Sequence, residues 1–365
     1  MGIALAGLTA LAVAMGIGRF AFTPLLPMMQ ADAGLTLAQG GWLASANYAG
    51  YLVGALTAAR APLGIRGGLV AIAAATAAMA LQGSFALWIV LRFIAGVASA
   101  WVLVQVSAWS LEHLAAAGRV RLSGVVFAGV GTGIAAAGLL CLGLMAARAG
   151  SGLAWVALGA ASLAATALLW RLFNGTGAAA APRRQEGWQP RWWWLVIAYG
   201  AYGFGYIIPA TFLPAMARDL VADPAVFGWA WPVFGLAAMA STLAAVKIHD
   251  ARRLWIAAHL VLAAGVVLPV AFSGLGGILV SALLVGGTFT VITLAAMRDA
   301  RAVAGAQAAR LMAALTAAFA AGQIVGPLFV SLLAQMHWSF ERGLLIAGAG
   351  LALGALAFIP GRERP

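Results

Sequence analysis

The sequence is a succession of apolar runs, each close to the length of a helix that crosses a lipid bilayer. Such a helix needs roughly 20 apolar residues, within a range of roughly 17 to 25. Charged residues, prolines and turn residues divide the chain into twelve segments of this kind. Because a backbone in lipid must satisfy its own polar groups, each segment is expected to form an α-helix. The predicted spans cover residues 4–27, 38–60, 68–84, 86–111, 122–147, 152–173, 192–216, 226–247, 253–273, 276–297, 308–335 and 342–360.

The composition is that of a chain whose solvent is mostly lipid. Of the 365 residues, 64% are hydrophobic and only 8% are charged, whereas about 25% are charged in an ordinary soluble domain. This excludes a cytosolic enzyme, a nucleic-acid-binding protein and a disordered chain. The net charge of +12 comes from basic residues scattered between apolar runs, without a basic stripe. The single cysteine, Cys141, excludes an intrachain disulfide and a cysteine-based metal site.

The basic residues are distributed unevenly between the two sides of the predicted membrane. With the N-terminus inside, sixteen of the 21 lysines and arginines fall in cytoplasmic segments, three in outer segments and two within spans. Cytoplasmic loops of membrane proteins carry such an excess, and a wrong number of spans would scramble it. We therefore predict a multi-pass protein with both termini in the cytoplasm.

The longest polar break covers residues 174–191. It holds a run of small residues, Pro182, Pro190 and the adjacent pair Arg183 and Arg184. This composition is typical of a flexible linker. The predicted organisation is an N-terminal six-helix bundle over residues 1–173, a cytoplasmic linker over 174–191 and a C-terminal six-helix bundle over 192–365.

The two bundles share a repeat with an offset of 187 residues. The match needs no gap across the first two spans of each bundle, and it runs in the same direction, as in a parallel repeat of transporter halves. Agreement of glycine, proline, tryptophan and aspartate is harder to reach by chance than agreement of common apolar residues. The paired positions are Gly16 and Gly203, Gly18 and Gly205, Pro27 and Pro214, Asp32 and Asp219, Gly41 and Gly228, Trp42 and Trp229, and Arg60 and Lys247.

Spans 5 and 11 carry glycines one helical turn apart. Span 5 has Gly129 and Gly133, and span 11 has Gly322 and Gly326 followed by Pro327. Small residues at this spacing let helices approach closely, and a proline kinks a helix. The residues predicted to have gating or structural roles are Pro27, Asp32, Arg60, Pro214, Asp219, Gly322, Gly326 and Pro327.

Three stretches resemble the major facilitator superfamily of transporters. Leu91–Gly96 resembles its Arg-x3-Gly motif, and Gly322–Pro327 resembles its glycine-proline motif. Gly16–Gln30, followed by Gly40-Gly41-Trp42 and Asn47-Tyr48, resembles the YbfB-like branch of bacterial members. The resemblance implies an all-α integral protein of the bacterial inner membrane, with twelve helices in two six-helix bundles related by a parallel repeat. It also implies that spans 1, 4, 7 and 10 line a central cavity.

The sequence departs from the family in the loop between spans 2 and 3. That loop usually carries Gly-x3-Asp-Arg-x-Gly-Arg, whereas residues 54–67 include Arg60 but no aspartate. The acidic part of this cytoplasmic latch is therefore missing. Asp250, Arg252 and Arg253 after span 8 offer a partial replacement.

Two arginines, Arg19 and Arg92, lie within predicted spans, and none of the nine acidic residues does. A charge at membrane depth is costly and marks a functional candidate. On a helix that lines a cavity, a guanidinium would present a planar fork to a carboxylate or a phosphate. The structural alternative is an arginine that bonds backbone carbonyls or extends its side chain to the interface.

Aromatic and polar side chains gather near the depth of Arg19. All five tyrosines lie in spans 2 and 7, whereas an ordinary aromatic belt would scatter them at the membrane interfaces. These groups would form a pocket with a cation, hydroxyl donors and aromatic walls, although each polar one could instead make an ordinary helix–helix hydrogen bond. The predicted substrate-binding residues are Arg19, Asn47, Tyr48, Tyr51, Arg92, Gln105, Tyr202, Tyr206, Thr290 and Gln323.

These features favour a secondary transporter that moves a small organic solute, with an anionic group at Arg19, by alternating access. An efflux pump of the same fold and a non-transporting receptor or scaffold are the alternatives. An intramembrane enzyme would need paired acids, histidines or a serine–histidine set at membrane depth, and none is found. We expect no cofactor, no metal, no nucleic-acid partner and a monomer. A coupled proton would travel on the substrate or use an acid at the mouth such as Asp32.

Overall fold

The computed structural model describes the chain except for residues 82, 174–188, 222, 246, 249 and 357–365. Within that part every regular element is a helix, so the protein has the predicted all-α class. The first span is broken into three pieces: α1 (Gly2–Leu11), the π-helix η1 (Ala12–Ile17) and α2 (Phe22–Asp32).

The remaining long helices follow in chain order, joined by short turns. Four short elements lie between them: η2 (Ala58–Arg60), η3 (Val120–Leu122), α9 (Pro224–Phe227) and η4 (Gly305–Gln307). The long helices are α3 (Leu37–Thr57), α4 (Ile65–Ala78), α5 (Phe85–Ala116), α6 (Ser123–Ala146), α7 (Ser151–Leu169), α8 (Trp192–Leu220), α10 (Ala230–Ala245), α11 (Ala251–Ala271), α12 (Leu275–Ala304), α13 (Ala308–Gln335) and α14 (Phe340–Leu356).

Each of the twelve predicted spans corresponds to one of these helices, counting the broken first span once. In the described residues, eight spans are long and apolar enough to cross a membrane by themselves. Two further helices, α4 and α10, are apolar but shorter. Helix α3 has 21 residues but is not among the eight, and its sequence carries Gln39, Ser45 and Asn47. Gln39 forms a capping box with Thr36 at the start of the helix, while Ser45 and Asn47 are buried and so face protein rather than lipid.

Several predicted boundaries differ from the observed ones. Span 68–84 ends early because α4 stops at Ala78, and Ser84 instead caps α5 by accepting a hydrogen bond from the Leu87 amide at 3.2 Å. Helices α5 and α12 run past the predicted ends, so Glu112 and Asp299 lie in their last two turns. The predicted linker lies outside the described residues up to residue 188, as does the predicted end of the last span at 357–360.

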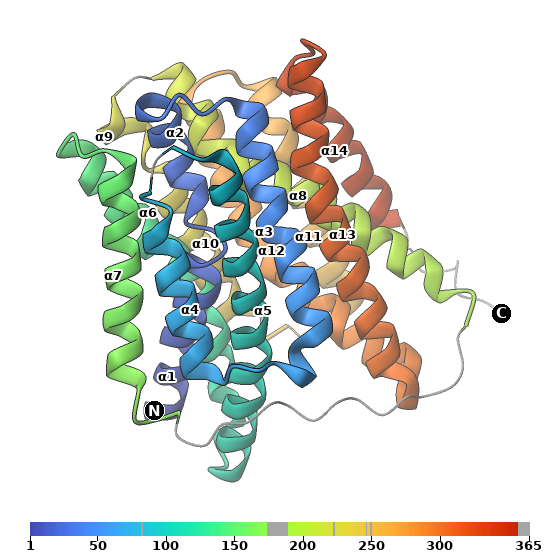
Figure 1. Ribbon diagram of the computed structural model, residues 1–365. Coiled ribbons are helices and arrows are strands. Elements are labelled where there is room, and N and C mark those ends of the chain that lie inside the picture. The colour runs from blue at the N-terminus through green and yellow to red at the C-terminus, as the bar shows by residue number, and fades with distance from the viewer. Residues whose placement is uncertain (82, 174–188, 222, 246, 249, 357–365) are drawn as a thin grey trace.

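The helices run side by side through one bundle (Figure 1). We call the end where α1 begins at Gly2 and α5 ends at Ala116 the near face, and the end where α2 finishes at Asp32 and α7 begins at Ser151 the far face. Helices α1 to α7 are called the N-terminal half, and α8 to α14 the C-terminal half.

Glycines make equivalent close helix contacts in the two halves. A methyl group on Gly129 would overlap the backbone of Leu8, so α6 packs directly on α1. A methyl group on Gly322 would overlap the backbone of Gly200, so α13 packs directly on α8. The fifth span of each half therefore lies against the first, at glycine-sized separation.

Close contacts also join the two halves. Helix α6 packs on α10, α3 on α13, and α2 on α8. A methyl group on Gly235 of α10 would overlap the backbone of Ala135 of α6, and one on Gly41 of α3 would meet Ser331 and the backbone of Pro327 in α13. The kink residue Pro327 thus lies at the contact between the halves.

Asp32 links two helices at the far face. Its carboxylate accepts hydrogen bonds from the Ser151 amide and, at 2.8 Å, from the Ser151 hydroxyl. An acid at a helix N-terminus satisfies a free amide and complements the helix dipole, so Asp32 anchors α7. The repeat partner Asp219 has a side chain that is 72% exposed and lies 3.8 Å from the Arg218 guanidinium. The repeat therefore preserves this residue without preserving its contact.

We predict that Asp32→Ala lowers the free energy of unfolding by about 1 kcal/mol, the usual cost of losing a helix cap. Asp219→Ala is the matched control, since it removes the same charge from the same face. Thermal unfolding in detergent should show a lower midpoint for Asp32→Ala only. Equal shifts in the two variants would mean that the carboxylate contact to Ser151 contributes nothing.

Candidate functional site

The first span loses its α-helical hydrogen bonds around Arg19. The amides of Gly18 and Phe20 bond to carbonyls five residues back at 2.9 and 3.1 Å, which is the π pattern. Residues 18–21 then form a turn before α2 begins. Pro24 has no amide hydrogen to continue the ladder, and the Phe20 carbonyl accepts from the Thr23 amide at 3.1 Å instead. The sequence therefore breaks the helix at the residue that carries the charge.

Arg92 and Asn47 bind the carbonyls of this broken segment. The Arg92 guanidinium donates to the Arg19 carbonyl at 2.9 Å and to the Gly18 carbonyl at 3.4 Å. The Asn47 amide donates to the Gly18 carbonyl at 3.2 Å and to the Arg92 carbonyl at 2.9 Å. Gly96 allows this arrangement, because a methyl group there would overlap the Asn47 carbonyl. The Arg92-x3-Gly96 spacing thus joins α3 and α5 behind the break.

The Arg19 side chain points toward the contact between the halves. Its Nη2 donates to the Gln323 side-chain oxygen on α13. Its Cζ lies 3.9 Å from the centroid of the Tyr51 ring and 5.2 Å from that of the Tyr48 ring. The side chain is only 2% exposed, so the aromatic faces supply much of its stabilisation as cation–π contacts.

The charge of Arg19 has no acidic partner in the part of the chain that the structure describes. The ion pairs there join Arg218 to Asp219, Arg252 to Asp299 and Arg253 to Asp250. Among the described residues the Arg19 Nε also has no hydrogen-bond acceptor. A buried cation surrounded by neutral groups carries a desolvation cost that a bound anion would offset.

Gln323 connects Arg19 to an aromatic cluster in the C-terminal half. Its side-chain nitrogen donates to the Tyr206 hydroxyl. The Tyr206 ring lies parallel to the rings of Phe289 and Phe319, with centroid separations of 5.5 and 5.6 Å. Arg19 and Tyr206 are 187 residues apart, so equivalent positions of the repeat meet at one amide.

The other tyrosines surround this cluster. Tyr202 stacks on Tyr206 at 5.2 Å and donates its hydroxyl hydrogen to the Phe289 carbonyl. Tyr48 lies with its hydroxyl 3.3 Å from the Thr211 hydroxyl of α8. The structure therefore brings together Arg19, Tyr48, Tyr51, Tyr202, Tyr206 and Gln323 from the predicted set, with Asn47 and Arg92 behind the break.

Sequence reasoning missed Thr211 and the phenylalanines of the cluster. Phe289 and Phe319 sit in helices that are mostly apolar, so hydrophobic periodicity does not single them out. Phe20 follows Arg19 directly, and its ring lies 6.3 Å from that of Phe289. The 187-residue offset was the available signal for Thr211, because it leads from the residues around Pro24 to the same depth in α8.

Two predicted site residues have their partners elsewhere. Gln105 donates to the Leu63 carbonyl at 3.0 Å, in the turn before α4. Thr290 accepts from the Thr242 hydroxyl at 2.9 Å and so joins α12 to α10. Both bonds are of the helix-packing kind that the sequence left as the alternative.

At the near face, the residues considered for the missing latch have separate partners. Asp250 caps α11 through the amides of Arg252 and Arg253, at 3.1 and 3.0 Å. Arg252 lies 3.6 Å from Asp299, whose side chain is 6% exposed. Arg60 is exposed at the end of η2. The acid facing Arg252 thus comes from α12 rather than from the loop.

The bonds between the halves lie on one side of the site. In the described residues they occur at the level of Arg19 or nearer the far face. Thr23 donates to the Ala210 carbonyl at 2.9 Å, and these positions are 187 residues apart, as expected for a contact on a pseudo-two-fold axis. The others join Ser45 to Ile324, Tyr48 to Thr211, Ser331 to Ala38 and Arg218 to Pro27.

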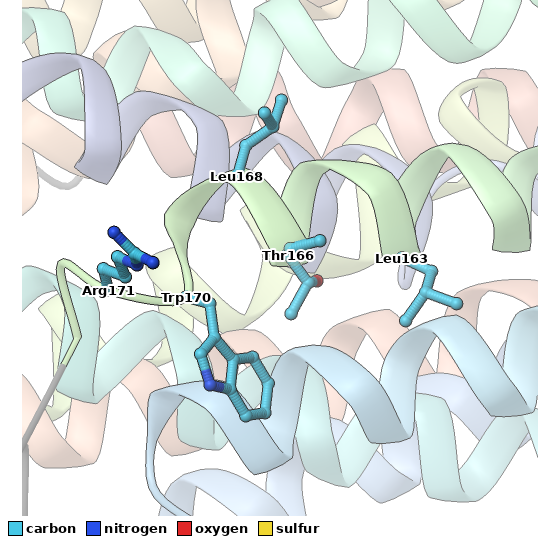
Figure 2. A pocket seen from close by; sticks show the side chains of 6 residues that line it. Leu163, Thr166, Leu168, Trp170 and Arg171 are labelled. Carbon is cyan, nitrogen blue, oxygen red and sulfur yellow. The ribbon is translucent and has the colours of Figure 1, made fainter.

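A surface groove lies on the near-face end of α7 (Figure 2). It is lined by Leu163, Thr166, Leu168, Trp170 and Arg171, among others. None of its lining residues belongs to the Arg19 cluster. It is therefore a separate feature of the outer surface.

Comparison with protein families matches residues 11–359 to the family described as "Uncharacterised MFS-type transporter YbfB". No curated protein matches the sequence. The match covers both halves, including the broken segment and α13.

Solved structures share the fold at low sequence identity. A bacterial homologue of the human lysosomal transporter Spinster, in an inward-facing and occupied conformation, is 14% identical with a TM-score of 0.74 over 98% of this chain and 95% of that one. A variant of the nucleoside transporter NupG is 14% identical with a TM-score of 0.76 over 98% and 99%. A D-xylose–proton symporter is 16% identical with a TM-score of 0.69 over 99% and 98%.

We predict that Arg92→Met destabilises the protein by about 1–3 kcal/mol, because it removes the side-chain donor of the buried Arg19 carbonyl and one of two such donors to the Gly18 carbonyl. Hydrogen exchange should rise in peptides that contain residues 18–23, next to the break. The exposed Arg60→Met serves as control. Unchanged exchange around the break, with only a general loss of stability, would contradict the role of Arg92 as its support.

Proposed function

The chain belongs to the YbfB-type family of major facilitator transporters, and from this premise we propose that it carries a small organic anion across the bacterial inner membrane by alternating access. In this mechanism the two halves rock around a site near mid-membrane and open it to one side at a time. The near face would be cytoplasmic, in line with the excess of basic residues there.

One observation carries the proposed sign of the substrate: in the described part of the chain no acidic side chain pairs with the buried guanidinium of Arg19. A guanidinium offers several donors in one plane, which suits a carboxylate or a phosphate. An acid substrate would supply the charge that the surrounding tyrosines and Gln323 do not. Arg19 is thus the proposed anchor.

The aromatic surroundings favour a substrate with a flat or apolar body. Tyr48 and Tyr51 lie over the guanidinium, and Tyr206 stacks with Phe289 on the opposite half. Aromatic faces contact planar or apolar groups with little loss of conformational entropy. The acid group would bind Arg19 while its body packs among these rings.

The structures that share the fold support the transporter class, but the solutes in their names differ from the anion proposed for this chain. Two of them are named for a nucleoside and for D-xylose with a proton, and neither solute needs a cationic anchor of the Arg19 kind. In the described helices, no aspartate or glutamate lies at the depth of Arg19. We therefore propose that a coupled proton travels on the acid group of the substrate.

A thermal-shift screen of the purified protein tests the proposal. The probes are acetate, benzoate, succinate, citrate and inorganic phosphate, with benzamide and glucose as neutral controls. We expect at least one acid to stabilise the protein and the neutral compounds not to. Stabilisation by the neutral probes alone would overturn the anionic assignment.

The most effective acid is then measured against Arg19→Gln. Loss of charge-assisted hydrogen bonds should weaken binding by roughly 10- to 100-fold, and Arg19→Lys should retain part of it. Arg60→Gln removes an exposed charge and should bind as the unmodified protein does. Unchanged affinity in Arg19→Gln would show that the anchor lies elsewhere.

A further inference from the structure

Gln323 links the two halves through a single side-chain amide. Its side chain is fully buried on α13. Its oxygen accepts from the Arg19 guanidinium of the N-terminal half, and its nitrogen donates to the Tyr206 hydroxyl of its own half. One amide therefore holds both of the equivalent residues of the repeat.

The amide oxygen of Gln323 occupies the place that an anion needs. It accepts from Nη2 of Arg19, a terminal nitrogen that a carboxylate or phosphate would engage. The guanidinium is the charged donor in both cases, but a carboxylate or phosphate adds the attraction of an opposite charge and can pair bidentately, so a bound anion would outcompete the neutral amide at this nitrogen. Gln323 would then have to move, because both acceptors cannot lie at the same donor.

This displacement would affect the contact between the halves. The other bonds that cross between them, among the described residues, lie at the level of Arg19 or nearer the far face, as from Ser45 to Ile324 and from Thr23 to Ala210. The Arg19–Gln323 bond is the one that a ligand at Arg19 removes directly. Its loss removes one of the bonds that hold the two halves together.

We propose that Gln323 is a built-in substitute for the acid group of the substrate. In the empty protein its amide oxygen accepts a hydrogen bond from the Arg19 guanidinium and so links the two halves. The arriving anion displaces this oxygen and breaks the link. The proposal rests on the proposed function, namely that Arg19 binds an organic anion. It assigns Gln323 the role of a competitor rather than that of a substrate ligand.

The roles of competitor, ligand and simple packing contact predict different affinities. If Gln323 competes, its removal strengthens anion binding. If it contacts the substrate, its removal weakens binding. If it only packs α13 against the N-terminal half, its removal lowers stability without a specific effect on the anion.

The test uses the acid that gives the largest thermal shift in the screen above, titrated by calorimetry. Gln323→Leu should bind it several-fold more tightly, up to roughly tenfold, because the anion no longer has to displace the hydrogen bond between Arg19 and Gln323. Gln323→Glu should bind it at least roughly 100-fold more weakly, because the new carboxylate pairs with Arg19 permanently. Equal or weaker binding in Gln323→Leu would overturn the proposal.

Distances between spin labels provide a second readout that does not depend on the glutamate variant folding. The labels are placed by Ala31→Cys on α2 and Leu220→Cys on α8, both exposed near the far face, in a Cys141→Ala background. The acid should lengthen this distance in the otherwise unmodified protein, and Gln323→Leu should lengthen it without acid. An unchanged distance in both cases would overturn the proposal that losing the bond between Arg19 and Gln323 lets the halves separate.

The two proposals fail in different ways. If no acid binds, or if Arg19→Gln binds the acid normally, the proposed function is wrong and the role of Gln323 falls with it. If Arg19→Gln abolishes binding while both Gln323 variants bind as the unmodified protein does, the proposed function stands. Only the proposal that Gln323 competes with the acid for Arg19 is then wrong.

Discussion

The structure depends on how a single charge is held inside an apolar bundle. Arg19 sits where the first span stops being a helix, so the protein must stabilise a guanidinium and unbonded carbonyls at the same depth. Unpaired backbone groups cost several kcal/mol in lipid. Arg92 bonds the Gly18 and Arg19 carbonyls and Asn47 bonds the Gly18 carbonyl, while aromatic rings and Gln323 surround the charge. One group of neighbouring side chains thus stabilises both the broken backbone and the charge of Arg19.

The internal repeat explains why the site lies at the contact between the halves. Contacts between equivalent positions must fall near the pseudo-two-fold axis, and Thr23 to Ala210 is such a contact. Arg19 and Tyr206 are also equivalent, yet α8 remains continuous through Gly203 and Gly205 whereas the first span breaks. One scaffold therefore carries a cation on one half and a stacked phenol on the other, which gives the site two chemically different sides.

The sequence predicted the spans well because membrane helices are constrained by length and apolarity alone. It was less successful with the helix ends, since near the faces polar and apolar residues mix, as in the last turns of α12 around Asp299. Among site residues, buried charge and clustered tyrosines were informative signals. Gln105 and Thr290 were not, because a polar residue in a helix gives no indication of which neighbour it will bond.

The sequence by itself determined the all-helical class, the number of spans, the repeat and the presence of two arginines, Arg19 and Arg92, within predicted spans that hold no acid. These follow from composition, periodicity and position along the chain. Only the tertiary structure decided that Arg92 supports a broken backbone, that Gln323 bridges Arg19 and Tyr206, and that Phe289 stacks on the latter. Such contacts join residues between 73 and 304 positions apart, and their partners are fixed by helix packing rather than by any local pattern.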